Sequence, residues 1–173
     1  HITSLEEAEL SKGEHESFVL AKKPTLVSGG VYEVTIEVTD LSGKISEPKI
    51  ATRVTFDDTP PEVFFTSPSS DAYRNRPAIG YDLSEALSSA SVIWLRTEGE
   101  EDVSSPHVVA LESLELSGGP HADSLLTNDP FLKDGAIYDV QMVGIDSAGN
   151  VSDTVSVTGI IYDTTPPELI VSY

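Results

Sequence analysis

The sequence contains no cysteine among its 173 residues, which excludes disulfide bonds, cysteine-ligated zinc and thiol catalysis. It also lacks any apolar run near the roughly 18 residues that a membrane-spanning helix requires. Basic residues are scarce, with 10 Lys plus Arg against 29 Asp plus Glu and a net charge of -19. Such a surface is repelled by phosphates and anionic headgroups, so we expect no nucleic acid partner.

The composition nevertheless predicts a folded protein, because 39% of the residues are hydrophobic and aromatic residues occur throughout. The length exceeds the roughly 100 residues of one β-sandwich, so we expect more than one module. Since the chain begins with His1 and not with a signal peptide, we also expect it to come from a longer protein. The acidic surface suits an extended rod and attracts divalent cations, although we expect most carboxylates to be simply solvated.

An internal repeat dominates the organisation of the sequence. Three pairs of landmark residues are each separated by 106 positions: Tyr32 and Tyr138, Asp40 and Asp146, and Pro60 and Pro166. The same register extends to the beginning of the chain, where residues 1–6 align with residues 107–112. A constant period of this length predicts an array of similar modules.

Paired prolines predict the linkers between modules, because proline lacks an amide donor and forces the preceding residue to be extended. The predicted division is the C-terminal part of a first module at 1–57, a complete module at 58–162, and a linker with the first strand of a following module at 163–173. The first module then lacks its opening strands and exposes an apolar face. We expect a neighbouring repeat of the same chain, or self-association, to cover that face.

The clearest predicted strand covers residues 32–40, where apolar and polar residues alternate over a full strand length. This alternation predicts one buried face, made of Tyr32, Val34, Ile36 and Val38. The equivalent strand covers residues 138–146, with Tyr138, Val140 and Met142 pointing inward. Further strands are predicted at 63–67, 78–84, 91–97, 108–111, 122–126 and 155–162. About seven short strands per module, with no helical periodicity, favour an all-β two-sheet sandwich over a barrel.

One local feature points to the immunoglobulin-like version of this sandwich. The pattern Leu-x-x-Gly-x-x-Tyr ends at Tyr32 and again at Tyr138, placing a tyrosine at the start of the alternating strand. A tyrosine there forms a corner in which its hydroxyl bonds to the backbone a few residues upstream. Trp94 is then expected on a central strand, packed against the core.

Several motifs in order resemble the bacterial immunoglobulin-like repeats of giant surface proteins and adhesins. They are residues 81–87, 105–107, 135–138, 146–150 and 162–167. The resemblance spans the whole chain and implies a spacer in an extracellular or cell-surface protein, in which related arrays often bind Ca²⁺ at module junctions. The first module departs from the pattern where Lys44 stands in place of Asn150, which weakens any shared function of that loop.

Catalytic signatures are not found in the sequence. The four histidines form two pairs related by the repeat, His1 with His107 and His15 with His121, and a catalytic histidine is not expected twice. There is no nucleophile elbow, P-loop, His-Glu-x-x-His or glycine-rich dinucleotide turn. We therefore expect that the protein is not an enzyme.

A Ca²⁺ site at the junction of two modules is the sharpest chemical hypothesis. A chain leaving one sandwich meets the loops at the entry pole of the next, which brings together Asp57, Asp58, Glu85, Asp146 and Asn150. Oxygen ligands of this kind suit Ca²⁺, and no other cofactor is expected. The alternative is structural, because Asp and Asn before Gly form ordinary turns and Asp before Thr-Pro is common in linkers.

Two other functions stay open on the sequence. The first is a module that binds carbohydrate or protein through its loops, with residues 97–105 as the most exposed candidate. The second is an accessory domain of a secreted hydrolase, which differs only in what lies beyond these ends. The distal ligand itself has no signature in the sequence.

Overall fold

A computed structural model describes residues 1–15 and 19–171. Across this part of the chain the protein is all-β, with ten strands in three sheets and two short 3-10 turns. The predicted absence of α-helices is confirmed for these residues, and none of them forms a helix long and apolar enough to cross a membrane. The chain divides into two compact units, His1–Asp58 and Thr59–Tyr173.

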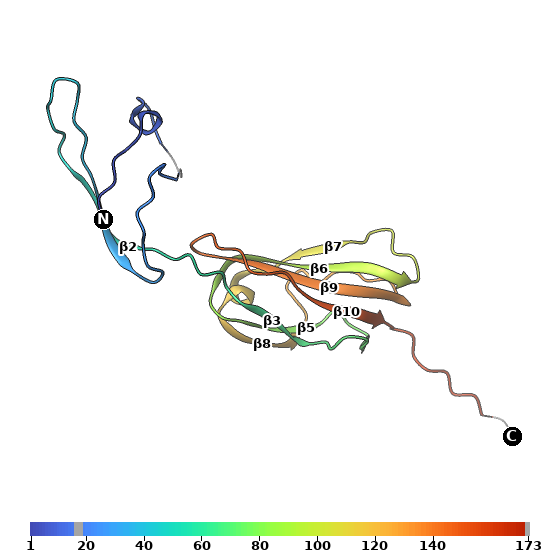
Figure 1. The fold of residues 1–173 in the computed structure, drawn as a ribbon. Helices are drawn as coiled ribbons and strands as arrows, with labels where there is room; N and C mark the ends of the chain where they lie inside the picture. Colours follow the sequence, from blue (N-terminus) through green and yellow to red (C-terminus); the bar gives the residue numbers. More distant parts are fainter. Residues whose placement is uncertain (16–18, 172–173) are drawn as a thin grey trace. The chain divides into compact units, whose positions relative to one another are not determined.

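The second unit contains two sheets (Figure 1). One has three strands in the order β3 (Val63–Ser67), β5 (Ile79–Leu83) and β8 (Gly119–Ser124). The other has five strands in the order β4 (Tyr73–Arg74), β10 (Val155–Tyr162), β9 (Ala136–Asp146), β6 (Leu87–Gly99) and β7 (His107–Ala110). All pairs are antiparallel except β4 with β10, and the turn η2 (Ser113–Leu116) connects β7 to β8.

One hydrophobic core lies between these two sheets. In β9 every second side chain is buried, so Tyr138, Val140 and Met142 point inward as the alternation predicts. In the five-stranded sheet, β6 contributes Trp94, which is fully buried. In the three-stranded sheet, β5 contributes core side chains from the opposite side. Burial of each large apolar side chain contributes about 1.5–3 kcal/mol, so this interface supplies most of the stability of the unit.

Three strands of the second unit differ from the sequence prediction. β4 is missed, because Tyr73–Arg74 is too short to alternate. β8 begins at Gly119, earlier than the predicted 122–126, although Gly119 and Pro120 are typical turn residues; both pair with β5, and Gly119 does so with a positive φ of 101°. β6 is longer than the predicted 91–97, because bulges at both ends continue its pairing with β9.

Among its described residues, the first unit contains a two-stranded antiparallel sheet and one 3-10 turn. The strands are β1 (Val31–Ile36) and β2 (Lys49–Thr55), and the turn is η1 (Glu7–Leu10). The prediction of a buried face over residues 32–40 is wrong for this chain, since Val34, Ile36 and Val38 are 43%, 53% and 44% exposed and Tyr32 is only half-buried. No second sheet covers them among the described residues, and a face is buried only when another layer packs on it.

The double prolines lie in segments without regular structure, at 56–62 and 163–171. The predicted module boundaries at 57/58 and 162/163 stay predictions. Residues 16–18 of the predicted first module and 172–173 of the predicted third lie outside the described residues.

Candidate functional site

The predicted cation ligands are distributed over both units. In the second unit, Glu85 lies in the connection from β5 to β6, Asp146 ends β9, and Asn150 belongs to the turn that follows. Asp57 and Asp58 follow β2 in the first unit. There the Ser28 hydroxyl donates to the Asp57 carboxylate at 3.1 Å and accepts the Asp58 amide at 3.2 Å.

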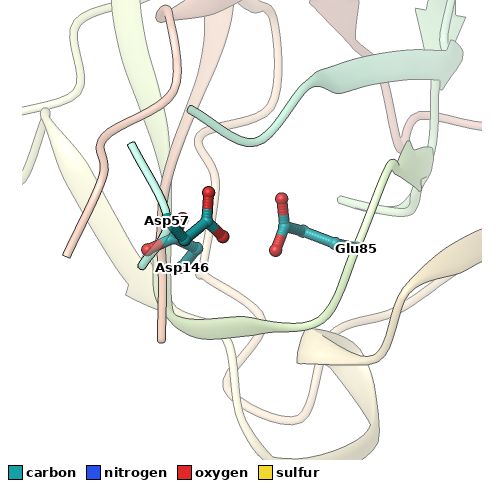
Figure 2. Close-up of side chains that lie close together, drawn as sticks. All are labelled: Asp57, Glu85 and Asp146. Atoms are coloured by element: carbon teal, nitrogen blue, oxygen red, sulfur yellow. The ribbon is translucent and has the colours of Figure 1, made fainter. Parts of the chain in front are cut away.

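Within the second unit, Glu85 and Asp146 form an acidic pair (Figure 2). The two residues come together because Leu87 pairs with Asp146 at the end of the β6–β9 ladder. Their carboxylates bring one oxygen each within 4.8 Å of the other. Two oxygens bound to one Ca²⁺ at 2.3–2.6 Å lie at most about 5.2 Å apart, so this spacing is compatible with a shared ion.

Asp146 also has a structural task, which its hydrogen bonds define. Its Oδ1 accepts the amides of Ala148 and Asn150 at 2.8 and 2.9 Å, and its Oδ2 accepts the side-chain amide of Asn150 at 2.8 Å. The residue is 1% exposed. Burial alone would raise the pKa of this carboxyl, but the bonds from Asn150, Ala148 and Gly149 together lower it.

The first unit has a similar turn without an asparagine. Asp40 Oδ1 accepts the Ser42 amide at 2.8 Å, the Ser42 hydroxyl at 2.7 Å and the Lys44 amide at 2.9 Å. The hydrogen bond from the Ser42 side chain is the largest cause that lowers the pKa of Asp40. Lys44 stands where the second unit has Asn150. It therefore lacks the side-chain amide bond to the aspartate, but its backbone amide makes the same contact. The turn of Asp146 thus has a structural explanation, and a Ca²⁺ ion at the Glu85–Asp146 pair stays a prediction.

A second polar cluster, Asp102, His107 and Tyr138, lies at the other end of the β6–β7 hairpin. The Tyr138 hydroxyl accepts the Lys133 amide at 2.8 Å, as the tyrosine-corner pattern predicts. It also donates to Asp102 Oδ2 at 2.6 Å, and His107 Nε2 contacts the same oxygen at 2.7 Å. The side chains of His107 and Asp102 are only 13% and 8% exposed.

This cluster affects how the loop 97–105 is interpreted. Burial by itself would raise the pKa of Asp102, but hydrogen bonds from His107, Tyr138 and the Ser104 amide together lower it. Burial and the Asp102 carboxylate both raise the pKa of Tyr138. Asp102 thus anchors the loop to the core and is not available to a ligand. The sequence gives no sign of this contact, because Asp102 and Tyr138 are far apart along the chain.

A third cluster fixes the exit of the chain from the second unit. Asp134 accepts the Thr164 hydroxyl at 2.7 Å and the Thr165 hydroxyl at 2.8 Å. It also accepts the Thr164 amide, and that bond is the largest cause that lowers the pKa of Asp134. The beginning of the proline segment is therefore tied to the turn before β9.

A scan against protein-family models finds no match for the chain, and a search of curated protein sequences finds none either. Its function is therefore inferred from the hydrogen bonds, burial and charges of its own residues.

Proposed function

We propose that the chain is a stretch of tandem immunoglobulin-like repeats that serves as a spacer in a large bacterial secreted or cell-surface protein. The observation that carries this proposal is a set of hydrogen bonds that recurs at an offset of 106 residues. The Val27 amide donates to the Tyr32 hydroxyl at 2.8 Å, and the Lys133 amide donates to the Tyr138 hydroxyl at 2.8 Å. Residues of different type, Val27 and Lys133, thus make the same backbone contact.

The correspondence extends to the short turns. η1 follows Glu6 and η2 follows Glu112, at the same offset. The Glu6 amide donates to the carboxylate of Glu9 at 2.6 Å, and the Glu112 amide donates to that of Glu115 at 2.8 Å. The two turns thus have the same capping arrangement, which supports a copied unit.

Backbone conformation is also shared where the residues differ. β1 pairs Tyr32 with Val54 and Val34 with Ala51, and β9 pairs with β10 through the equivalent residues and the same bulge. Inside this bulge Arg53 has φ of 59° and Gly159 has φ of 73°. Positive φ is unfavourable for arginine, so its presence there supports a common architecture imposed on both copies.

The immunoglobulin-like assignment is supported by the corner and the core of the second unit. Tyr138 is the first large inward-facing side chain of β9, and its ring meets Trp94 edge-on, with centroids 6.2 Å apart. A buried tryptophan between two antiparallel sheets, next to such a corner, is typical of this class of sandwich.

A spacer role is supported by what the polar clusters do. The His107–Asp102–Tyr138 group pairs a base with a carboxylate, but Tyr138 is fully buried, so no substrate reaches its hydroxyl. The Asp134–Thr164 contacts hold the linker to the unit it leaves, which stiffens a joint between modules. Both clusters thus order the chain, which supports a structural role. A Ca²⁺ ion held by Glu85 and Asp146 would add rigidity at the entry side of the module.

Single-molecule pulling on the full chain tests the spacer proposal. We expect the second unit to unfold in one cooperative step that releases about 350 Å, since about 100 residues each extend by 3.3–3.6 Å. Gradual extension at low force would contradict a spacer that resists tension.

Glycan and protein arrays probed with the same chain test the alternative functions. A spacer shows no retention on either array. Saturable retention of one ligand would instead favour a carbohydrate- or protein-binding module, or an accessory domain of a secreted hydrolase.

A further inference from the structure

The five-stranded sheet of the second unit has one face in the core and an outer face that points away from it (Figure 1). We propose that this outer face binds the same face of a second copy of the chain, so that two sandwiches pack through their five-stranded sheets. This lateral contact adds to the spacer role and does not depend on it.

The outer face consists of the side chains that alternate with the core residues. In β6, Val92 and Trp94 are fully buried, so the residues beside them in the strand point outward. The pairing register continues this face across the neighbouring strands, because Ser91 pairs with Val143 of β9 and with Ala110 of β7. The large apolar members of the face are Ile93, Leu95, Val108, Val143 and Ile145.

The outer face carries little charge although the chain is strongly acidic. Charged residues make up 23% of the sequence, and the net charge is -19. Asp139 is the only charged residue in the strand segments 89–95, 108–110 and 139–145, and its Oδ1 accepts the Gly159 amide at 3.0 Å. Like charges brought together at an interface cost several kcal/mol. Two copies of the chain can therefore meet on this face with little burial of opposed carboxylates.

The first unit shows that this architecture does not require an uncharged face. At the offset of 106 residues, Glu33 corresponds to Asp139 and Glu37 corresponds to Val143. Both glutamates are exposed. A glutamate is thus compatible with the position of Val143, so the apolar residue found there has a purpose other than folding. Contiguous exposed apolar residues mark interaction surfaces.

The size of the face is close to what a dimer needs. Strands lie about 4.8 Å apart and rise about 3.3 Å per residue, so four strands of the length of β9, which has 11 residues, present at most roughly 700 Å². Each partner of a stable interface contributes roughly 800 Å². We therefore expect a weak, reversible dimer.

A second copy is the partner that matches this face best. A basic protein would find few carboxylates here to recognise, whereas a second copy presents the same apolar side chains and the same lack of charge. A two-fold axis brings identical patches together, and two sheets stack face to face about 10 Å apart. The leucine, isoleucine and valine side chains of the two copies would then fill the space between the sheets.

Sedimentation equilibrium of the full chain in the presence of chelator tests the proposal. We expect a monomer–dimer equilibrium at concentrations below about 1 mM, because the interface is slightly smaller than the standard size. Association should strengthen as NaCl rises from about 0.02 M to about 0.5 M, since salt screens the repulsion between two acidic chains. A chain that stays monomeric at about 1 mM in the higher salt, or association that weakens with salt, overturns the proposal.

Matched variants locate the contact. Val143→Glu introduces the residue type that the first unit has at this place and should weaken the dimer at least about tenfold. Val108→Glu should do the same from β7, where the side chain is 63% exposed and its replacement leaves the core intact. Val103→Glu is the control, because Val103 is 87% exposed and lies outside this face, and it should leave the dimer unchanged. A dimer that withstands both Val143→Glu and Val108→Glu overturns the proposal.

Val34→Glu separates this contact from association through the first unit. Val34 is 43% exposed on β1, so a dimer formed there would dissociate when it is replaced. We expect Val34→Glu to leave the dimer unchanged, and a dimer that only this variant dissociates would overturn the proposed face. None of these outcomes affects the spacer proposal, which is tested by pulling and by the arrays.

Discussion

The hydroxyl of Tyr138 bridges two segments, since it accepts the Lys133 amide at 2.8 Å and donates to Asp102 Oδ2 at 2.6 Å. One oxygen atom therefore links the turn before β9 to the loop between β6 and β7. The ring lies in the core, edge-on to Trp94.

Tyr138→Phe removes both hydrogen bonds while keeping the ring in place. We expect the free energy of unfolding of the second unit to decrease by about 1–3 kcal/mol, because the Lys133 amide and the Asp102 carboxylate each lose a hydrogen-bond partner. Urea denaturation followed by Trp94 fluorescence measures this loss. Tyr73→Phe is the control, since Tyr73 is 71% exposed, and should change stability by less than about 0.5 kcal/mol. Equal effects of the two substitutions would contradict the role of the corner.

Acid should destabilise the second unit partly through Asp102. Hydrogen bonds lower the pKa of Asp102 below its ordinary value of 3.8 in the folded state. Its contribution to stability is therefore complete above pH 3.8 and is lost as the pH falls through the lower, folded-state pKa. Asp102→Asn should flatten the fall in urea midpoint between about pH 4 and pH 2. If Asp102→Asn leaves the pH dependence of the urea midpoint unchanged, this contribution is excluded. Glu101→Gln is the control, because Glu101 is exposed.

A side chain added at position 159, in the bulge of β10, should destabilise the second unit. Gly159 has φ of +73°, and an added Cβ would lie 2.3 Å from Asp71 Oδ1. Gly159→Ala should therefore destabilise the unit by about 1–3 kcal/mol, measured by thermal or urea unfolding. Gly149→Ala separates the cost of a positive φ from the cost of the contact with Asp71, because Gly149 has φ of +92° and open space around it. A cost for Gly159→Ala no larger than that for Gly149→Ala would show that Asp71 moves freely.

Calcium binding can be tested without damaging the turn of Asp146. Glu85→Gln removes one carboxylate of the acidic pair and none of the turn bonds. We expect calorimetry to detect Ca²⁺ binding to the parent chain and a higher melting temperature in Ca²⁺ than in chelator. Both effects should decrease in Glu85→Gln and persist in Glu168→Gln. If neither millimolar Ca²⁺ nor chelator changes the parent chain, the predicted site is wrong.

Local sequence patterns predicted the local structure well. Alternation from 32 and from 138 predicted β1 and β9, although the first strand ends at Ile36, and the spacing of leucine, glycine and tyrosine predicted the corner, whose partners are five residues apart. Alternation alone predicted that Val34 is buried, whereas the missing opening strands predicted an exposed apolar face; Val34 is 43% exposed, because burial depends on a second layer that alternation does not specify.

Contacts between distant residues were harder to predict. The link from Asp102 to Tyr138 joins residues 36 positions apart, and nothing in the sequence around Asp102 distinguishes it from an ordinary loop carboxylate. Likewise, Glu85 and Asp146 were grouped from an assumed loop arrangement, whereas the approach of their carboxylate oxygens to within 4.8 Å follows from the β6–β9 register.

The bonds from Thr164 and Thr165 to Asp134 determine where tension on the C-terminal tail enters the second unit. A pull on the tail acts first on the turn before β9, and the Gly135 amide bonded to the Tyr162 carbonyl at 2.8 Å holds the same turn to the end of β10. Those bonds have to break before β10 separates from β9. Mechanical opening of the second unit from this end would thus begin at a threonine-bonded carboxylate outside the hydrophobic core.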